Sequence, residues 1–317
     1  MTGQSKITIL RVSHVYYKHK DVEAAQQFLA DFGFIETKRV GNKIYYRGYG
    51  TESFVYCLEG ADEDEFGGTG FVVQSLGDLE RARERIPTAS EIYDLADAPG
   101  GGKCVTIRDP VDGWPLHLVY GQTLVEPTKE YHYVNFNFPH KKNRGGGEFQ
   151  RFDKGPANVH KMGHFGMCVT DFDKVYNFYT TLFNFKASDI QYDEAGKYIG
   201  AFLHIDLGEQ LTDHHTFFIF EGPKSHVHHS SFEVHDFDTE VLGHDWLRHK
   251  NYKNCWGVGR HVMGSQIFDY WYDTSGFILE HYVDGDLVNC HTETKVSQAS
   301  PDGLHVWGPD VPEGFLG

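Results

Sequence analysis

Cysteine is scarce in this chain, and its few cysteines form no recognisable motif. The 317 residues include five cysteines, an odd number, with no Cys-X-X-Cys pair among them. This pattern argues against both a disulfide framework and a thiolate zinc cluster. We therefore expect a reducing, cytoplasmic setting. The five are Cys57, Cys104, Cys168, Cys255 and Cys290.

Positive charge and long apolar runs are scarce as well. Lysine and arginine together number 29 against 45 acidic residues, which gives a net charge of −16 with histidine neutral. An excess of negative charge opposes sequence-independent binding to nucleic acid and any attraction to anionic membranes. No stretch approaches the roughly 18 apolar residues of a membrane span, and the first residues contain no apolar signal core. We therefore expect neither a nucleic-acid partner nor a membrane partner.

Histidine, by contrast, is abundant. The chain has 20 histidines, together with 18 tyrosines and 24 phenylalanines. Chemistry that is rich in imidazole and poor in thiolate suits a first-row metal held by nitrogen and oxygen ligands.

The chain contains a divergent copy of itself. Residues 13–34 resemble residues 163–185, half a chain length further on. Each segment begins with a short alternating strand, passes through an aspartate suited to a helix N-cap, Asp21 or Asp171, and continues into an amphipathic helix. Self-similarity at this distance predicts a duplication.

Each predicted helix is followed by a residue that tolerates the left-handed backbone conformation. These residues are Gly33 in the first copy and Asn184 in the second. Since helices commonly end in that conformation, both are expected to terminate their helices.

Two further correspondences extend the duplication and give the fold class. Residues 66–82 parallel 227–243, and residues 107–120 parallel 271–282. Within each copy, a strand, a helix and further strands occur twice. We therefore predict an α+β protein of two tandem domains, each built from two βαβββ modules. The expected parts are an N-terminal domain over 1–139, a linker over 140–156, a catalytic domain over 157–285 and an irregular arm over 286–317.

Three side chains at equivalent strand positions of the second copy are candidate metal ligands. They are His164, His229 and Glu280. Strand alternation places each of them on the face opposite the side chains that pack on a helix. Two imidazoles and one carboxylate form the facial triad that leaves positions open on ferrous iron.

The first copy provides an internal comparison for these ligands. At the corresponding positions it has His14, Gly68 and His117. Because glycine supplies no ligand, we expect the N-terminal domain to be free of metal.

With these residues the sequence resembles the type I extradiol ring-cleavage dioxygenases, which are catechol 2,3-dioxygenase-like members of the vicinal oxygen chelate superfamily. The resemblance covers nearly the whole chain. Its most specific stretch, 259–282, contains in order His261, Tyr270, a Ser–Gly turn and Glu280, which is similar to the family signature. One departure is the Asp-Thr that stands before this turn, where the family usually has Asp-Pro.

The resemblance implies roles for several residues outside the metal triad. His215 takes the part of the family's acid–base histidine, with its neighbour His214 as the alternative. His261 is expected to hydrogen-bond a substrate oxygen or the bound dioxygen product, and Tyr270 to donate a hydrogen bond to the hydroxyl-bearing carbon. Trp256, near His261 in sequence, is expected to line the site of the aromatic ring.

The implied activity is an Fe(II)-dependent extradiol dioxygenase that cleaves a catechol with O2 beside its two hydroxyls. Manganese is the alternative metal, and a homo-oligomer is the expected assembly. No cluster of arginines lies near the site in sequence, and residues 264–271 and 304–316 resemble the branch that acts on alkylated or trihydroxylated catechols. An uncharged catechol of that kind is therefore expected. The alternatives are a hydroquinone-cleaving dioxygenase, a glyoxalase-like metal-dependent lyase or isomerase, and a ligand-binding protein without catalysis.

Overall fold

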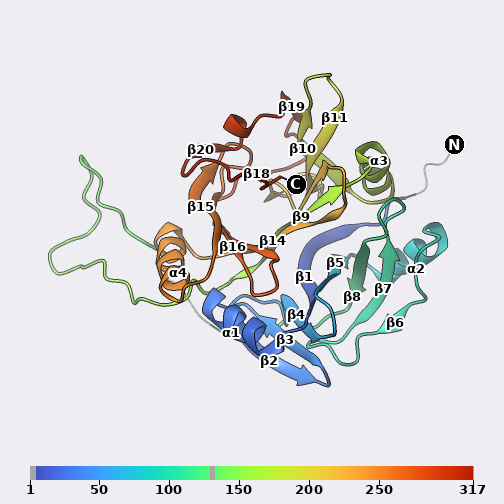
Figure 1. The fold of residues 1–317 in the computed structure, drawn as a ribbon, viewed down its shortest axis with the longest axis horizontal. Helices are drawn as coiled ribbons and strands as arrows, with labels where there is room; N and C mark the ends of the chain where they lie inside the picture. Colours follow the sequence, from blue (N-terminus) through green and yellow to red (C-terminus); the bar gives the residue numbers. More distant parts are fainter. Residues whose placement is uncertain (1–4, 129–132, 317) are drawn as a thin grey trace.

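The computed structural model describes residues 5–128 and 133–316, in which two large mixed sheets carry four α-helices on their outer sides (Figure 1). Within these residues no helix is long and apolar enough to cross a membrane. The sheets follow one another in sequence: the first is formed before residue 121 and the second after residue 160.

The first sheet has eight strands in the order β2-β3-β4-β1-β5-β8-β7-β6. Its elements are β1 (Ile9–His19), α1 (Val22–Phe32), β2 (Ile35–Val40), β3 (Lys43–Arg47), β4 (Tyr56–Gly60), β5 (Glu65–Val73), α2 (Leu76–Arg85), β6 (Tyr93–Asp94), β7 (Lys103–Arg108) and β8 (Pro115–Tyr120).

The second sheet has ten strands in the order β19-β10-β11-β13-β9-β14-β17-β16-β15-β20, and β12 pairs separately with β18. The elements are β9 (Lys161–Val169), α3 (Phe172–Leu182), β10 (Phe185–Tyr192), β11 (Tyr198–Ile205), β12 (Thr212–Asp213), β13 (Phe217–Glu221), β14 (His226–Glu233), α4 (Phe237–His249), β15 (Asn254–His261), β16 (Ile267–Tyr272), β17 (Ile278–Val283), β18 (Leu287–Val288), β19 (Lys295–Gln298), the short 3-10 helix η1 (Pro301–Gly303) and β20 (His305–Trp307).

Each large sheet is assembled from two βαβββ modules. The first strand of a module pairs in parallel with its last strand, as β1 does with β4 and β9 with β13. The first strands of the two modules then pair with each other in antiparallel fashion, β1 with β5 and β9 with β14. The expected α+β class with four such modules is confirmed.

The helix ends follow the sequence prediction with one exception. Asp21 and Asp171 cap α1 and α3 by accepting hydrogen bonds from the backbone amides of Ala24 and Lys174. Gly33 ends α1 at φ 108°.

The exception is Asn184, which was expected to end α3 in the left-handed conformation. The capping residue of α3 is Phe183, in an extended conformation. The side chain of Asn184 instead accepts a hydrogen bond from the amide of Ile9 and donates one to the Ile9 carbonyl. Asn184 therefore joins the two halves of the chain, a contact that sequence spacing does not reveal.

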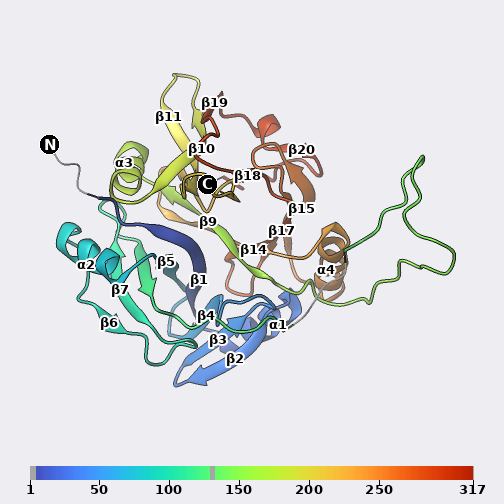
Figure 2. The same ribbon diagram turned by 180° about the vertical axis from the view of Figure 1, so that it is seen from behind.

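The two halves share one hydrophobic core, which contains residues from both sheets. Polar contacts cross the same boundary: the hydroxyls of Tyr17 and Ser230 lie 2.8 Å apart, and His281 donates a hydrogen bond to the carbonyl of Phe32. Helices α1 and α4 pack side by side there, as Figures 1 and 2 both show. The second sheet therefore packs directly against the first.

The segments outside the sheets differ in character. Described residues between β8 and β9 contain no helix or strand, and part of this stretch projects as a long loop beside α4 (Figure 1). Residues 286–316, expected to be irregular, add β19 and β20 to the two edges of the second sheet. These strands are three or four residues long, too short for their alternation to be visible in the sequence.

The cap of α1 can be tested by mutation. Replacing Asp21 with alanine removes the acceptor for the Ala24 amide and should lower the free energy of unfolding by about 1 kcal/mol, measured by denaturant titration. Asp21→Asn keeps a capping oxygen and should stay close to wild type. Equal losses in both variants would show that charge at this position, and not capping, matters.

Candidate active site

Three neighbouring strands of the second sheet bring His164, His229 and Glu280 together. His164 lies on β9, His229 on β14 and Glu280 on β17, and their nearest ligand atoms all lie within 4.8 Å of one another. His164 Nε2 is 3.0 Å from Glu280 Oε2, and His229 Nε2 is 3.6 Å from the same oxygen. All three side chains are buried. This arrangement could hold a metal ion with two nitrogen ligands and one carboxylate.

The pairing of the strands explains why these three residues meet. His164 is opposite Ser231, and Ser231 is opposite Glu280, so the three lie in one row across the sheet. His229 stands two residues before Ser231 on the same strand. Because side chains two residues apart point to the same face, His229 joins the row from one side.

The first sheet repeats this row with different residues. There His14 is opposite Gly70, and Gly70 is opposite His117. Gly68, two residues before Gly70, takes the place of His229. The sequence alignment of the two copies therefore agrees with the strand register.

Three ligand atoms of the second row lack a hydrogen-bond partner in the described part of the chain. Among the residues that the structure describes, none hydrogen-bonds His229 Nε2 or either carboxylate oxygen of Glu280. Burial would raise the pKa of Glu280, but His164 and His261 outweigh it and lower the pKa below its usual value. Burial and the neighbouring histidines lower the pKa of His229 well below normal. An ionised carboxylate beside a neutral imidazole, both unpartnered, fits a divalent cation.

In the first row, the side chain of His117 is hydrogen-bonded within the protein. His117 bonds the Thr106 hydroxyl through Nδ1 and the Gly67 carbonyl through Nε2, each at 2.9 Å. A side chain at Gly68 would meet the Pro115 carbonyl at 2.4 Å and His117 Nε2 at 2.9 Å. This row therefore has neither a middle ligand nor space for one.

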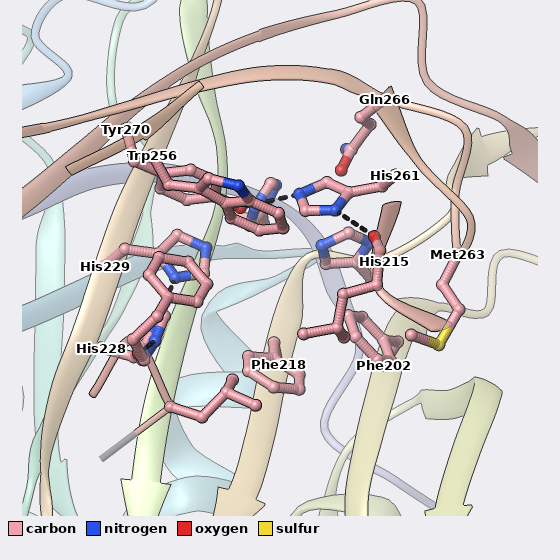
Figure 3. Close-up of a pocket in the computed structure, with 14 residues that line it drawn as sticks. Phe202, His215, Phe218, His228, His229, Trp256, His261, Met263, Gln266 and Tyr270 are labelled. Atoms are coloured by element: carbon pink, nitrogen blue, oxygen red, sulfur yellow. Dashed lines mark hydrogen bonds between the residues drawn. The ribbon is translucent and has the colours of Figure 1, made fainter. Parts of the chain in front are cut away.

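A small pocket of about 40 Å³ opens beside the second row (Figure 3). Its walls are aromatic and aliphatic side chains and histidines, and no lysine, arginine, aspartate or glutamate is among the lining residues. The lining residues are His164, Phe202, His215, Phe218, His228, His229, Trp256, His261, Met263, Gln266, Tyr270, Leu304, Phe315 and Leu316.

Of the two adjacent histidines considered from sequence, His215 is the one that lines the pocket. It precedes β13, and its ring centroid lies 4.2 Å from that of His164. Burial and then the neighbouring His164 lower the pKa of His215 well below its usual value, which favours a neutral imidazole. The ring of His214 turns away to Asp189, with His214 Nε2 2.8 Å from Asp189 Oδ2. The geometry thus presents His215, and not His214, to a ligand.

His261 and Tyr270 reach the pocket as a hydrogen-bonded pair from β15 and β16. His261 Nδ1 donates to the Leu304 carbonyl at 2.9 Å, and the Tyr270 hydroxyl lies 2.9 Å from His261 Nε2. Burial raises the pKa of Tyr270 well above its usual value, so its hydroxyl stays protonated. With Nδ1 donating, the neutral His261 ring accepts at Nε2.

Trp256 lies on the same wall, where its indole ring is nearly parallel to the Tyr270 ring, with centroids 5.9 Å apart (Figure 3). Its indole nitrogen donates to the Pro309 carbonyl at 2.8 Å. Trp256 therefore both lines the pocket, as expected, and supports Tyr270.

Several lining residues were not identified from the sequence. Phe202 and Phe218 come from β11 and β13, and Phe315 comes from the segment after β20. No spacing pattern separates these apolar side chains from core residues. His228, to which the sequence analysis gave no role, also lines the pocket, and burial lowers its pKa to about 4.

Sequence comparison places the second half of the chain among known proteins. The model of the Glyoxalase/Bleomycin resistance protein/Dioxygenase superfamily matches residues 161–281. Metapyrocatechase 2 of Cupriavidus necator is 29% identical over 157 residues, which cover 49% of this chain and 47% of that protein, about half its length. Biphenyl-2,3-diol 1,2-dioxygenase of Paraburkholderia xenovorans (strain LB400) is 24% identical over 87% of this chain and 88% of that one.

Solved structures share the fold over the whole chain. Homoprotocatechuate 2,3-dioxygenase of Brevibacterium fuscum, in complex with 3,4-dihydroxyphenylacetate, superposes with a TM-score of 0.80 at 16% identity, covering 99% of this chain and 93% of that one. The Mn(II)-bound glyoxalase of Novosphingobium aromaticivorans has a TM-score of 0.78 at 23% identity, covering 99% and 95%. Together with the sequence relatives, these matches confirm the resemblance to the vicinal oxygen chelate and extradiol dioxygenase proteins.

The metal site can be tested without any assay of turnover. His229→Ala and Glu280→Ala each remove one of three ligands and should abolish retention of metal, measured as metal content after anaerobic loading with Fe(II) and desalting. His117→Ala is the matched control from the first row and should retain metal as wild type does. Equal loss from the control would mean that the first half also binds metal.

Proposed function

Because the model of the Glyoxalase/Bleomycin resistance protein/Dioxygenase superfamily matches residues 161–281, we propose that this chain is an Fe(II)-dependent extradiol dioxygenase. It opens the ring of a catechol with O2, beside the two hydroxyls, and both oxygen atoms enter the product. His164, His229 and Glu280 hold the metal, with Mn(II) as the alternative ion. Two sequence relatives bear the names of catechol-type dioxygenases, which supports this activity.

One observation carries the proposal: a buried triad adjoins a pocket that presents His215, His261 and Tyr270, and His229 Nε2 and both Glu280 oxygens lack a hydrogen-bond partner among the described residues. All three ligands come from strands of one sheet, β9, β14 and β17. A glyoxalase-like site of the kind considered from sequence would draw ligands from both halves. A ligand-binding protein without catalysis would need neither the triad nor the acid–base groups.

Ferrous iron, when bound, supplies the positions at which the diol and O2 meet and the electrons that pass between them. His215 is a neutral imidazole that accepts a proton from one catechol hydroxyl and returns it as the ring opens. The Tyr270 hydroxyl, which burial keeps protonated, donates to His261 Nε2 in the structure and would turn from it to donate a hydrogen bond to a substrate oxygen during ring opening. His261, whose ring is held by the Leu304 carbonyl at Nδ1, would accept a hydrogen bond at Nε2 from a substrate hydroxyl.

The pocket lining favours an uncharged substrate. No cationic side chain lies in the lining to pair with a carboxylate substituent. Phe202, Phe218 and Trp256 instead provide apolar surface for a ring and its alkyl substituents. We therefore assign an alkylated or trihydroxylated catechol as the substrate class.

We further propose a homo-oligomer in the cytoplasm. The projecting loop before β9 carries several exposed aromatic side chains, which are unusual on a solvated surface and suit a subunit contact. They are Phe136, Phe138, Phe149 and Phe152.

The activity is tested with an oxygen electrode. Protein loaded anaerobically with Fe(II) should consume O2 with alkylcatechols or hydroxyquinol and form a yellow ring-opened product. His229→Ala serves as the metal-free control. Uptake with hydroquinones alone would favour a para-diol enzyme, and no uptake with any diol at full iron occupancy would overturn the proposal.

The acid–base role is tested at His215. His215→Asn should keep its metal but lower kcat about 10²-fold or more, because a positioned proton acceptor contributes that much to rate. Metal content and kcat are measured on the same samples. Turnover equal to wild type would remove His215 from the mechanism.

A further inference from the structure

Two pairs of consecutive histidines stand at the pocket, and both pairs have the same geometry. In the pair His214–His215 the two Nδ1 atoms lie 3.2 Å apart, and in the pair His228–His229 they lie 2.6 Å apart. One member of each pair belongs to the site described above, His215 as the acid–base group and His229 as a metal ligand. Figure 3 shows His228 and His229 next to each other on one wall of the pocket.

The outer member of each pair is anchored by its other nitrogen. His214 Nε2 lies 2.8 Å from a carboxylate oxygen of Asp189, and His228 Nε2 lies 2.5 Å from the backbone carbonyl of Phe315. A carboxylate and a carbonyl can only accept. The hydrogen of each outer imidazole is therefore on Nε2.

This anchoring determines the direction of the Nδ1 contact. A neutral imidazole that donates from Nε2 accepts at Nδ1. The inner ring must then donate from its own Nδ1, which leaves its Nε2 lone pair free. For His229 that atom faces Glu280 and has no hydrogen-bond partner among the described residues. For His215 the free Nε2 is the atom that can accept a proton.

We propose that His214 and His228 are positioning residues, which fix His215 and His229 as the tautomer that is protonated at Nδ1 and free at Nε2. The importance of Nε2 in His215 and His229 rests on the proposed function, but the hydrogen-bond chains themselves do not. The hydrogen-bond chain from Asp189 through His214 leaves Nε2 of His215 as a proton acceptor. The hydrogen-bond chain from the Phe315 carbonyl through His228 leaves Nε2 of His229 as a metal ligand, and so links the segment 311–316 to the metal centre.

Burial and packing favour a single arrangement of the hydrogen-bond chain that runs from Asp189 through His214 to His215. Asp189, His214 and His215 are all buried, so water does not compete for their hydrogen bonds. The Ser188 hydroxyl donates to the carbonyl of His214 at 2.6 Å. Gly264 is packed so closely that a side chain on it would meet His214 Nδ1 at 2.9 Å. The His214 ring is therefore confined between Asp189 and His215.

The first chain is tested by substitution at His214. In protein labelled with 15N-histidine and loaded with Zn(II), the imidazole nitrogen shifts of His215 should show the Nδ1–H tautomer. His214→Leu removes the acceptor and should give a mixture of tautomers, with kcat of the Fe(II) enzyme at least 10-fold lower and KM changed less than 3-fold. His214→Asn, whose side-chain oxygen can take the place of Nδ1, should recover both readouts.

The control for this experiment is His19→Leu, the same change at a buried histidine of β1 that bonds Ser275 and Tyr56. It should leave the His215 tautomer and kcat as in wild type. An Nε2–H tautomer of His215 in the wild-type protein, or an unchanged tautomer in His214→Leu, would overturn the inference. Because the nitrogen shifts need no turnover, that failure is distinct from an absence of dioxygenase activity.

The second chain is tested through metal affinity, measured by competition between the protein and a chromophoric chelator for Co(II). A chain that ends at Asp310 lacks the Phe315 carbonyl and should bind Co(II) at least 10-fold more weakly, the usual effect of losing a partner of a metal-bound histidine. Phe315→Ala removes the ring but keeps the carbonyl and should bind within 3-fold of wild type. Equal affinity in the shortened chain, or an equal loss in Phe315→Ala, would overturn the role of the carbonyl.

Discussion

The site depends on the register between β9, β14 and β17. The opposition of His164, Ser231 and Glu280 across these strands puts two ligands in one row, and His229 enters that row because it stands two residues before Ser231. A slip of one residue in either pairing would turn a ligand to the helix-covered face. The register is in turn fixed by that covered face, where Phe165 and Phe232 are fully buried in the core. Apolar packing on the helix-covered face of the sheet thus fixes the positions of His164, His229 and Glu280 on the opposite face.

Burial of the triad removes water as a hydrogen-bond partner for its ligand atoms. Buried polar groups are normally hydrogen-bonded, and a buried carboxylate without partners is strongly destabilising. Among the described residues, both oxygens of Glu280 and Nε2 of His229 lack a hydrogen bond. His164 and His261 lower the pKa of Glu280, but they leave these three atoms unbonded. A divalent cation would supply the missing partners, which is why these residues suit a metal centre better than a structural network.

Much of the fold was predictable because the signals are local or repeated. The duplication, the capping aspartates Asp21 and Asp171, and the strand alternation that gave His164, His229 and Glu280 can all be read along the chain. What could not be predicted depends on contacts between distant segments. Asn184 bonds β1 instead of closing its helix, and Phe315 reaches the pocket from the far end of the second half. The resemblance favoured His215 over His214, but the contact of His214 with Asp189, which turns the His214 ring away, joins residues 25 positions apart and could not be predicted.

The two sheets share one strand register but differ in the side chains that this register brings together. Both place a histidine of the first strand opposite a small residue, and that residue opposite a polar side chain of the last strand. In the first sheet His117 is satisfied by Thr106 and by the Gly67 carbonyl, and the glycine at position 68 leaves no third ligand. In the second sheet the equivalent Glu280 has no hydrogen-bond partner among the described residues. The half that we propose to be catalytic is therefore the one whose last-strand side chain is not hydrogen-bonded within the described part of the protein.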